Sequence, residues 1–394
     1  MKNHFDVVVI GAGIFGVTAV SELQSRGYKT ALLDPGPLPH PLAASTDISK
    51  VIRMEYGHDE TYMAMVEAAL PLWRQLNERV GTTLYHEVGV TMFTRQPMAP
   101  GGYEYESFQM LQKRGHAPER LNADEISHRF PAWKPGAYID GFYHHLGGFV
   151  ESGQVVTELI KLAQKQGTAL FAGQTVNDLV RENGRITHIN TFEGETFHAG
   201  EVVVAAGAWT PLLVPELAPI MAASGHPVFH LETAVPKIFT PPTFTVFTAD
   251  IANSGWYGFP LHPHENVIKV ANHGVGQRLH PSHDTRIVTQ EDEVNLRHFL
   301  ADTFPDLAEA PIVYTRRCLY CDTLDEHFLI TRHPEIDNLT ISSGGSGHGF
   351  KFGQILGMLT AAAVAREEHP WLQKFRWRDL STKTTGEEAA RYHG

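Results

Sequence analysis

The apolar positions at the start of the chain change their period from that of a strand to that of a helix and back. Residues 5–10 form a largely apolar run rich in valine, which predicts a strand buried on both faces. A glycine-rich turn follows, and apolar residues then recur at helical intervals as far as Leu23, before Gly27 ends the helix. A second apolar run over 29–33 leads into Asp34. The pattern predicts a strand, a tight turn, a helix and a second strand in direct succession.

Further along the chain, helical and strand-like patterns alternate in blocks. The predicted elements are a helix over 61–80, a helix over 153–166, hairpin turns at 183–184 and 193–194, a buried strand within 201–209, a β-rich stretch over 228–269, a strand over 339–342 and an apolar helix over 352–365. Segments of α/β type therefore occur at the start, in the middle and at the end, with β-rich material between them. This order predicts a discontinuous nucleotide-binding domain that carries an inserted second domain, with a ligand held where the two meet.

The turn after the first strand has the spacing GxGxxG at Gly11, Gly13 and Gly16. In a dinucleotide-binding turn the first glycine permits the tight bend, the second lets the backbone approach a pyrophosphate, and the third lets the helix pack on the strand. The helix N-terminus then offers unpaired N–H groups to the phosphates, and Asp34 would bind the adenosine ribose. A lone glycine motif can be a chance turn, but here the strand, turn, helix, strand and acid follow in order. The motif predicts a dinucleotide without separating NAD from FAD.

Composition narrows the class of protein. The 394 residues exceed one simple core, so two domains are expected, and 42% hydrophobic with 19% charged residues is typical of a globular protein. The net charge of −12 disfavours nonspecific binding to nucleic acid or to anionic membranes. No apolar stretch reaches the length of a membrane span, no signal-peptide pattern is present, and two cysteines make no disulfide framework. These features predict a cytoplasmic protein, and no metal site is predicted.

Several short blocks, taken together, resemble one family over essentially the whole length. The blocks are Gly11 to Gly16, Val51 to Gly57, Tyr257-Gly258-Phe259-Pro260, Ile268 to His273, Cys318-Leu319-Tyr320, Leu324-Asp325-Glu326-His327-Phe328 and Gly345 to Phe352. The chain is similar to the FAD-dependent amine oxidases related to monomeric sarcosine oxidase and N-methyltryptophan oxidase. The resemblance implies an α/β (α+β) flavoprotein fold of the glutathione-reductase-like or D-amino-acid-oxidase-like type. Its Rossmann-like FAD-binding domain would comprise residues 1–85, 147–215 and 318–394, and its β-rich substrate domain residues 86–146 and 216–317.

The resemblance also implies roles for individual residues. Cys318 matches the cysteine that holds FAD by a thioether, and Lys269 matches the lysine that promotes reduction of O2. Arg53 and Lys351 match the pair that binds the substrate carboxylate. The remaining matches are His273 near the amine, Tyr257 and Tyr320 in the pocket wall, and Gly347 and Gly349 in the turn that binds the flavin. Physical chemistry supports these roles, because two converging cations create an anion site in an acidic protein and a cation beside the flavin stabilises negative charge on oxygen.

Plainer interpretations stand beside these roles. Cys318 and Cys321 form a Cys-x-x-Cys pair, but the surrounding residues are strand-like, and a thioredoxin-type or zinc motif would need a different context. Two packed thiols are the simpler interpretation, and Cys321 is taken as either structural or lining the site. Arg53 and Lys351, taken singly, fit ordinary salt-bridge cations, and a lone histidine such as His273 is more often structural than catalytic. Lys269 is different, because a lysine in an apolar strand is expensive unless it has a function.

One departure from the sarcosine oxidase pattern leaves the substrate open. Lys50 stands where that pattern has an arginine facing the flavin, and the stretch 43–50 is closer to the fructosyl amino acid oxidases. Lys50 is kept as a cofactor-site residue.

The expected function is oxidation of secondary amines, most of all N-methyl amino acids, to imines, with O2 reduced to H2O2 by a monomeric enzyme. The alternatives are a fructosyl amino acid oxidase or pipecolate-type oxidase, an amine dehydrogenase with another electron acceptor, and a flavin- or NAD-binding sensor without catalysis.

Overall fold

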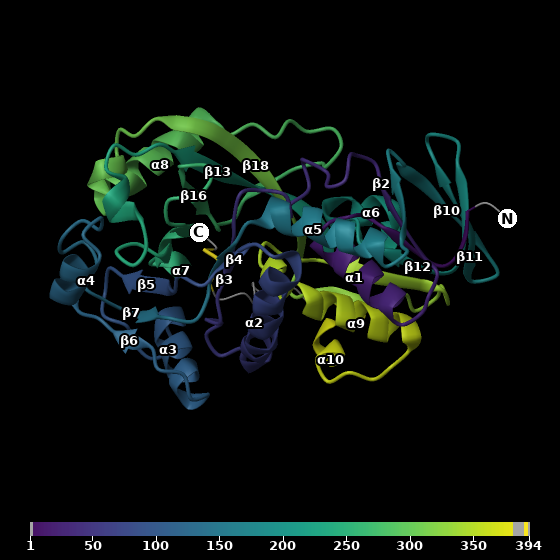
Figure 1. Ribbon diagram of the computed structural model, residues 1–394, viewed down its shortest axis with the longest axis horizontal. Coiled ribbons are helices and arrows are strands. Elements are labelled where there is room, and N and C mark those ends of the chain that lie inside the picture. The colour runs from purple at the N-terminus through teal and green to yellow at the C-terminus, as the bar shows by residue number, and fades with distance from the viewer. Residues whose placement is uncertain (1–2, 381–389, 393–394) are drawn as a thin grey trace.

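The computed structural model describes residues 3–380 and 390–392, and most of its strands belong to two large sheets (Figure 1). Within these residues one sheet has eight strands and the other has nine, and a third sheet has three. The two large sheets lie toward opposite ends of the long axis of the molecule in Figure 1. The mixed α/β fold expected from the sequence is confirmed, while the predicted domain boundaries stay a prediction.

The eight-stranded sheet contains the first strand of the chain at its centre. Its strands are β1(His4–Ile10), β2(Thr30–Asp34), β9(Ala169–Ala172), β10(Val176–Glu182), β11(Arg185–Thr191), β12(Thr196–Val204), β19(Leu329–Arg332) and β20(Leu339–Ser343). Strands β9, β2, β1, β12 and β20 run parallel, while β10 and β11 form an antiparallel hairpin that joins β12 and β19 pairs antiparallel with β20. Parallel strands that feed a helix are the expected frame for a nucleotide site at their carboxyl ends.

Both faces of β1 are buried, as its apolar sequence predicts. Val7 and Val9 pack on the face where α1, α5 and α9 lie, and Val8 and Ile10 pack on the opposite face. Successive side chains of a strand alternate between faces, so a strand covered on both sides needs an unbroken apolar run.

The helices are distributed over both halves of the molecule (Figure 1). Their bounds are α1(Ile14–Ser25), α2(Glu60–Val80), α3(Tyr103–Lys113), α4(Ala123–Arg129), α5(Ser152–Lys165), α6(Thr210–Leu213), α7(Ile251–Ser254), α8(Gln290–Thr303), α9(Gln354–Ala365) and α10(Leu372–Phe375). Short 3-10 helices are η1(Gly207–Trp209), η2(Pro215–Leu217), η3(Pro236–Phe239), η4(Pro305–Leu307) and η5(Phe350–Phe352). Helix α1 ends one residue before Arg26, and Gly27 then takes a φ of +91°, which confirms the predicted stop.

The nine-stranded sheet is built around the long antiparallel pair of β13 and β18, which are joined along their whole length. Its strands are β5(Val90–Thr94), β6(Glu119–Arg120), β7(Asp140–His144), β13(Met221–Leu231), β14(Val246–Ala249), β15(Trp256–Gly258), β16(Ile268–Asn272), β17(Gln277–Arg278) and β18(Ile312–Thr323). Its aromatic core includes Phe93, Trp133, Phe247 and Phe304. The small third sheet consists of β3(Lys50–Ile52), β4(Tyr85–His86) and β8(Gly148–Val150).

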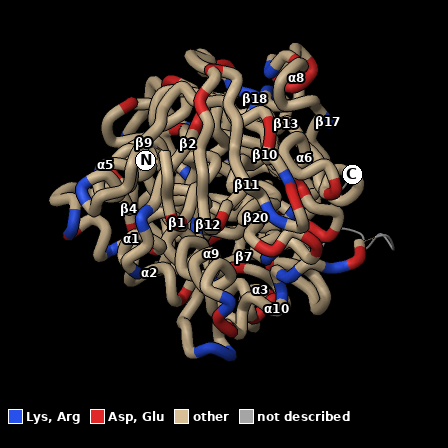
Figure 2. The backbone as a smooth tube through the Cα atoms, turned by 90° about the vertical axis from the view of Figure 1, so that its right-hand side faces the viewer, with Lys and Arg blue, Asp and Glu red and all other residues tan. Residues whose placement is uncertain are grey.

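Figure 2 shows Lys and Arg interspersed with Asp and Glu over the face in view. Among the described residues, none of the helices has the length and apolar character needed to cross a bilayer.

Candidate active site

The glycine-rich turn has the geometry of a dinucleotide cradle. Gly11 has a φ of +103°, and a Cβ placed on it would lie 2.5 Å from the Ala205 carbonyl oxygen at the end of β12. A Cβ on Gly16 would lie 1.8 Å from the Gly11 carbonyl oxygen, so only glycine lets α1 approach the strand. The Ser45 hydroxyl accepts a hydrogen bond of 2.9 Å from the amide of Ile14, at the helix N-terminus. These residues fit the diphosphate of a dinucleotide.

Asp34 holds the same turn from the end of β2. One carboxylate oxygen accepts a hydrogen bond of 2.8 Å from the Ala12 amide, and the other accepts one of 3.2 Å from the Gly36 amide. Burial raises the pKa of Asp34, and the two amides act against that rise. Each carboxylate oxygen has a second lone pair, so the predicted bond to a ribose hydroxyl is compatible with this supporting role.

Lys269 lies in β16 with its ammonium almost completely buried. The Nζ atom is 2.6 Å from Oδ2 of Asp47, donates to the Ser49 carbonyl oxygen at 2.5 Å, and lies 4.8 Å from the centre of the Phe259 ring. Burial lowers the pKa of Lys269 to about 8, against the opposing effect of the Asp47 charge. The ammonium is therefore charged at neutral pH and loses its proton as the pH rises through about 8.

Asp47 is a buried carboxylate that faces basic side chains from three strands. Beside Lys269, His230 of β13 places Nε2 at 3.4 Å from Oδ1, and the charge of Lys50 in β3 acts on the same group. Burial would raise the pKa of Asp47, but these neighbours, Lys269 foremost, hold it well below its usual range. Asp47 therefore stays ionised, and its charge opposes the lowering of the Lys269 pKa by burial.

Cys318 and Cys321 lie on opposite faces of β18, because residues three apart in a strand point in opposite directions. Cys318 packs with Tyr320, Ala271 and Tyr257, whereas Cys321 packs in the core beside the eight-stranded sheet. Both thiols are free. Burial raises the pKa of Cys321 to about 12, although the Ser343 hydroxyl donates to its sulfur at 3.6 Å. Cys321 is an inert core thiol, and the two cysteines do not form a redox pair.

The predicted tyrosines form one wall. Tyr257 and Tyr320 are hydrogen-bonded to each other through their side chains. One face of the Tyr320 ring stacks on His226 at 3.9 Å between ring centres, with 17° between the planes. Gly347 is so close that a Cβ there would lie 2.3 Å from the Tyr320 ring. The centre of the buried His273 ring lies 5.8 Å from that of Tyr320.

Arg53 and Lys351 meet at the ring of Tyr56. The Arg53 guanidinium lies 5.0 Å from the centre of that ring, and Lys351 donates to the Tyr56 hydroxyl at 2.8 Å. Arg53 also donates to the Glu55 carbonyl oxygen and, at 2.5 Å, to the Tyr103 hydroxyl. Both cations are buried, so the structure brings together the pair that the sequence predicts.

Directed hydrogen bonds run on from Lys351 to the turn after β18. The Glu326 carbonyl oxygen can only accept, so His348 Nε2 donates to it at 3.1 Å. His348 Nδ1 lies 3.0 Å from the Tyr56 hydroxyl, within hydrogen-bond distance. The Tyr56 oxygen also accepts a hydrogen bond from Lys351 Nζ at 2.8 Å. His348 thus connects Tyr56 to the Glu326 carbonyl oxygen.

The charges of the separate groups act on one another. Burial raises the pKa of Tyr257, and the charges of Asp47 and Arg53 act in opposite directions on the same hydroxyl. Lys269 with Asp47, the wall of Tyr257 and Tyr320, and Arg53 with Lys351 therefore border one region. Gly349 packs against Phe15 of α1, where a Cβ would lie 2.9 Å from that ring, so the last glycine turn lies beside the first.

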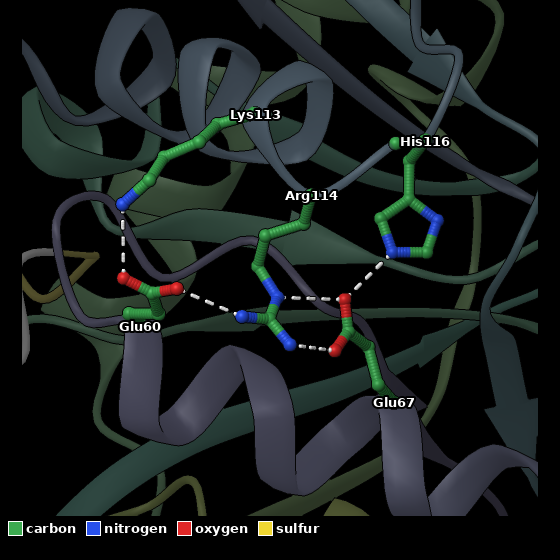
Figure 3. A pocket seen from close by; sticks show the side chains of 6 residues that line it. Glu60, Glu67, Lys113, Arg114 and His116 are labelled. Carbon is green, nitrogen blue, oxygen red and sulfur yellow. Dashed lines mark hydrogen bonds and ion pairs between the residues drawn. The ribbon is translucent and has the colours of Figure 1, made fainter.

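A surface hollow between α2 and α3 lies outside this region and is lined by charged side chains (Figure 3). Figure 3 shows Arg114 between Glu60 and Glu67, with Lys113 on the first glutamate and His116 on the second. These groups pair with one another, and the network joins two helices instead of presenting an open charge to a ligand.

Sequence reasoning missed three residues of the site: Asp47, Tyr56 and His226. Tyr56 stands inside a block that carried the family resemblance, and Asp47 stands inside the stretch that departs from the sarcosine oxidase pattern. The signal for both was present in those blocks. His226 had none, because a histidine in a strand is ordinary until its stacking partner is known.

Comparison with known proteins finds relatives that match nearly the whole length of the chain. A family profile described as "FAD dependent oxidoreductase" matches residues 6–363. Monomeric sarcosine oxidase from Bacillus sp. (strain B-0618) is 29% identical over 377 residues, which cover 94% of this chain and 95% of that protein. N-methyl-L-tryptophan oxidase from Salmonella heidelberg (strain SL476) is 29% identical over 361 residues, covering 91% and 94%. The resemblance inferred from the motifs is confirmed.

Solved structures agree on the fold. Fructosamine oxidase (Amadoriase II) from Aspergillus fumigatus superposes with a TM-score of 0.85 at 20% sequence identity, covering all of this chain and 94% of that chain. NikD, an amino acid oxidase of nikkomycin biosynthesis, superposes with a TM-score of 0.81 at 23% identity, covering 97% of this chain and all of that chain. The fold is thus that of flavin-dependent amine and amino acid oxidases.

Proposed function

The chain belongs to the family of FAD-dependent oxidoreductases, and we propose that it is an oxidase of secondary amines, acting on N-substituted amino acids such as N-methyl amino acids with O2 as electron acceptor. The observation that carries this proposal is the meeting of two buried cations, Arg53 and Lys351, at Tyr56. In a chain of net charge −12, such a pair serves an anion, and the anion common to amino acids is a carboxylate.

The substrate carboxylate would be bound by two side chains of different geometry, Arg53 and Lys351. Arg53 offers a planar guanidinium, and Lys351 offers an ammonium with rotatable donors. Both groups are already bonded to oxygen acceptors of the protein, namely the Glu55 carbonyl, the Tyr103 hydroxyl and the Tyr56 hydroxyl. These acceptors orient the two cations toward the proposed substrate site, and the Arg53 charge also acts on the buried Glu55 carboxylate.

The amine end of the substrate would face the wall of Tyr257, Tyr320 and His273. Burial favours the neutral amine over the ammonium, and only the neutral amine has a lone pair that can assist cleavage of the neighbouring C–H bond. The buried cations act in the same direction, because a positive environment disfavours a second positive charge.

FAD, when bound, would take the hydrogen and two electrons from the carbon next to nitrogen and pass the electrons to O2, giving an imine and H2O2. The part of Lys269 is to hold a positive charge where negative charge develops on oxygen. Asp47 and the Ser49 carbonyl fix the position of that ammonium. The position of Lys50 in β3, beside the same carboxylate, supports its assignment to the flavin site.

Cys318 is proposed as the covalent anchor of FAD. Its side chain lies on the same face of β18 as Tyr320 and packs against Tyr257, so it is directed toward the proposed site and not into the core. The proposal includes a monomeric, cytoplasmic enzyme, which two free cysteines suit.

A substrate screen with the purified yellow protein tests the function. H2O2 would be measured with N-methyl amino acids, pipecolate, fructosyl amino acids and the corresponding primary amino acids. Turnover that is fastest with an N-methyl amino acid is the expected result. A protein without bound flavin, or one that oxidises none of these compounds, would contradict the proposal.

One observation favours a fructosyl amino acid oxidase as the second candidate. Asp47, which pairs with Lys269, comes from the stretch 43–50 whose sequence is closer to that class. Faster turnover with a fructosyl amino acid than with any N-methyl amino acid would decide for this candidate. Turnover with an electron-accepting dye but none with O2 would instead indicate a dehydrogenase.

A further inference from the structure

Arg391, near the end of the chain, is a buried arginine in a socket of two carboxylates. Its guanidinium lies 2.7 Å from Oδ2 of Asp322 and 3.0 Å from Oε1 of Glu326, and its Nε donates to the Gly274 carbonyl oxygen at 3.1 Å. Only 4% of the side chain is exposed. A long arginine seldom gives up its hydration on a surface tail, so this burial has to be offset by specific contacts.

Glu326, one of the two carboxylates, belongs to the block Leu324-Asp325-Glu326-His327-Phe328, which carried the family resemblance but had no role, and Asp322 lies in β18. This turn follows β18, and Glu326 adopts a φ of +60°, a left-handed conformation that side chains other than glycine rarely take. The strained turn places the Glu326 carboxylate toward Arg391 and its carbonyl oxygen toward His348. One residue thus connects the end of the chain with the hydrogen bonds that run to Lys351.

Arg391 also touches the back of the proposed substrate pocket. Its Nη2 atom is 3.3 Å from Nε2 of His226, the ring that stacks on Tyr320. A guanidinium has only donors, so His226 Nε2 is an acceptor and its imidazole is neutral beside the cation. The Tyr320 ring is thus held by its stacking on His226 and by the close backbone of Gly347, which leaves no room for a Cβ.

The residue after Arg391 makes a second contact with the pocket. The Tyr392 amide donates to the His273 carbonyl oxygen at 3.1 Å, directly beside the Gly274 carbonyl that Arg391 binds. Two consecutive residues of the chain end therefore hold two consecutive carbonyls after β16. The segment fixes the backbone from which the His273 side chain projects.

We propose that Arg391 is a positioning residue of the substrate pocket, which fixes Tyr320 through His226 and fixes His273 through the carbonyl contacts of the chain end. The inference rests on the proposed function, because it assigns Tyr320 and His273 to the pocket wall. Arg391 touches no reacting atom, and its effect passes through these two side chains.

The test compares Arg391→Ala and Arg391→Lys with a matched control, Arg378→Ala, in the full-length holoenzyme. Arg378 binds the adjacent Asp325 through two contacts of 2.6 Å and the His327 carbonyl, but none of its contacts given by the structure reaches His226 or Gly274. Losing either arginine releases contacts between the C-terminal region and the turn after β18. Only the loss of Arg391 is expected to disturb the wall.

We expect Arg391→Ala to lower kcat/KM for the amine roughly 10- to 100-fold, in the range of a misplaced substrate. The rate of flavin reoxidation by O2, which depends on Lys269, should not change. Arg391→Lys should recover part of the loss, because a lysine keeps the charge toward Asp322 and Glu326. Arg378→Ala should keep the wild-type kcat/KM, even if it melts at a lower temperature.

Hydrogen–deuterium exchange gives a second readout without substrate. Peptides that contain His273 and Tyr320 should exchange faster in Arg391→Ala than in wild type and in Arg378→Ala. Unchanged exchange there, wild-type kcat/KM in a folded Arg391→Ala, or an equal loss in both alanine variants would overturn the inference. If the wild type oxidises no amine, the proposed function fails while the exchange data still decide the positioning role.

Discussion

The ammonium of Lys269 and the carboxylate of Asp47 form an ion pair of 2.6 Å in which the two side chains are 1% and 2% exposed. A buried pair of this kind gains little net stability, because desolvation of both charges offsets their attraction. Its consequence here is positional and electrostatic. The pair holds a positive charge at a fixed point beside the proposed flavin site. Its two residues lie more than two hundred positions apart in the sequence.

Replacing Lys269 by methionine, which keeps the aliphatic length, should slow the reaction with O2 specifically. Removing one group that stabilises charge in a transition state typically costs about 100- to 1,000-fold in rate. We expect a loss of that order in the rate at which O2 reoxidises the reduced enzyme in stopped-flow measurements. Reduction by the amine under anaerobic conditions should change much less. An equal loss in both half-reactions would contradict the assignment.

The same lysine predicts the pH dependence of oxygen reactivity. Burial lowers the pKa of Lys269 to about 8, so the ammonium is present below that pH and lost above it. The reoxidation rate should therefore fall as pH rises through about 8. In Asp47→Asn the charge that raises the pKa of Lys269 is removed, and the fall should move to lower pH. A pH profile that is flat in wild type, or unmoved in Asp47→Asn, would contradict this account.

Local patterns were sufficient to predict the frame of the nucleotide site. Residues 5–34 form strand, turn, helix and strand as predicted, because each element is specified by its own period of apolar residues and by Gly11, Gly16 and Gly27. The roles of Lys269 and Arg53 came from resemblance, and the structure adds their partners. No local pattern predicts those partners, because Asp47 contacts Lys269, and Tyr56 contacts Lys351, only in the folded chain.

The contribution of the chain end could not be predicted for the same reason. Arg391 is an ordinary basic residue in a polar tail, and its burial depends on the left-handed turn at Glu326 and on Asp322 two residues beyond Tyr320. The block that contains Glu326 was recognisable from the sequence. Its physical role could be inferred only from the distances of the Asp322 and Glu326 carboxylates to the Arg391 guanidinium.

The opposite orientation of the two cysteines in β18 predicts different results for the two substitutions. In the wild type, acid precipitation should leave flavin fluorescence in the protein pellet. Cys318→Ala should release the flavin into the supernatant, because this thiol lies in the tyrosine wall. Cys321→Ala, the matched control, removes a thiol from the core and should leave the flavin attached. Flavin in the supernatant of the wild type would show that no covalent bond forms.

Two glycines with positive φ, Gly11 in the glycine-rich turn and Gly27 after helix α1, should respond differently to substitution by alanine. Gly11 and Gly27 have φ values of +103° and +91°, so alanine at either position carries a backbone cost of about 1–2 kcal/mol. Only at Gly11 would the new Cβ also meet a backbone atom, the Ala205 oxygen at 2.5 Å, whereas nothing lies within 4 Å at Gly27. Gly11→Ala should abolish FAD loading, measured as the ratio of flavin to protein absorbance, while Gly27→Ala should load normally. Equal loading of both variants would exclude Gly11 from the cradle.

The meeting of Arg53 and Lys351 at Tyr56 predicts an effect confined to substrates with a carboxylate. Loss of one partner in a buried, hydrogen-bonded charge pair typically costs about 2–5 kcal/mol, so Arg53→Ala and Lys351→Met should each raise KM for an N-methyl amino acid about 30-fold or more. The double variant should lose less than the product of both, because the two cations share Tyr56. Tyr56→Phe, which keeps the ring and removes the hydroxyl, should have an intermediate effect.

The discriminating measurement repeats the comparison with the matching N-methylamine, which lacks the carboxylate. Wild type should use this amine poorly, and the substitutions at Arg53 and Lys351 should not lower its kcat/KM further, since the missing interaction is already absent. Arg74→Ala serves as the control for removing an arginine, because Arg74 is 45% exposed and pairs with Glu87 on the surface. An equal loss for the amino acid and for the amine would mean that the two cations support the fold of the site instead of binding the carboxylate.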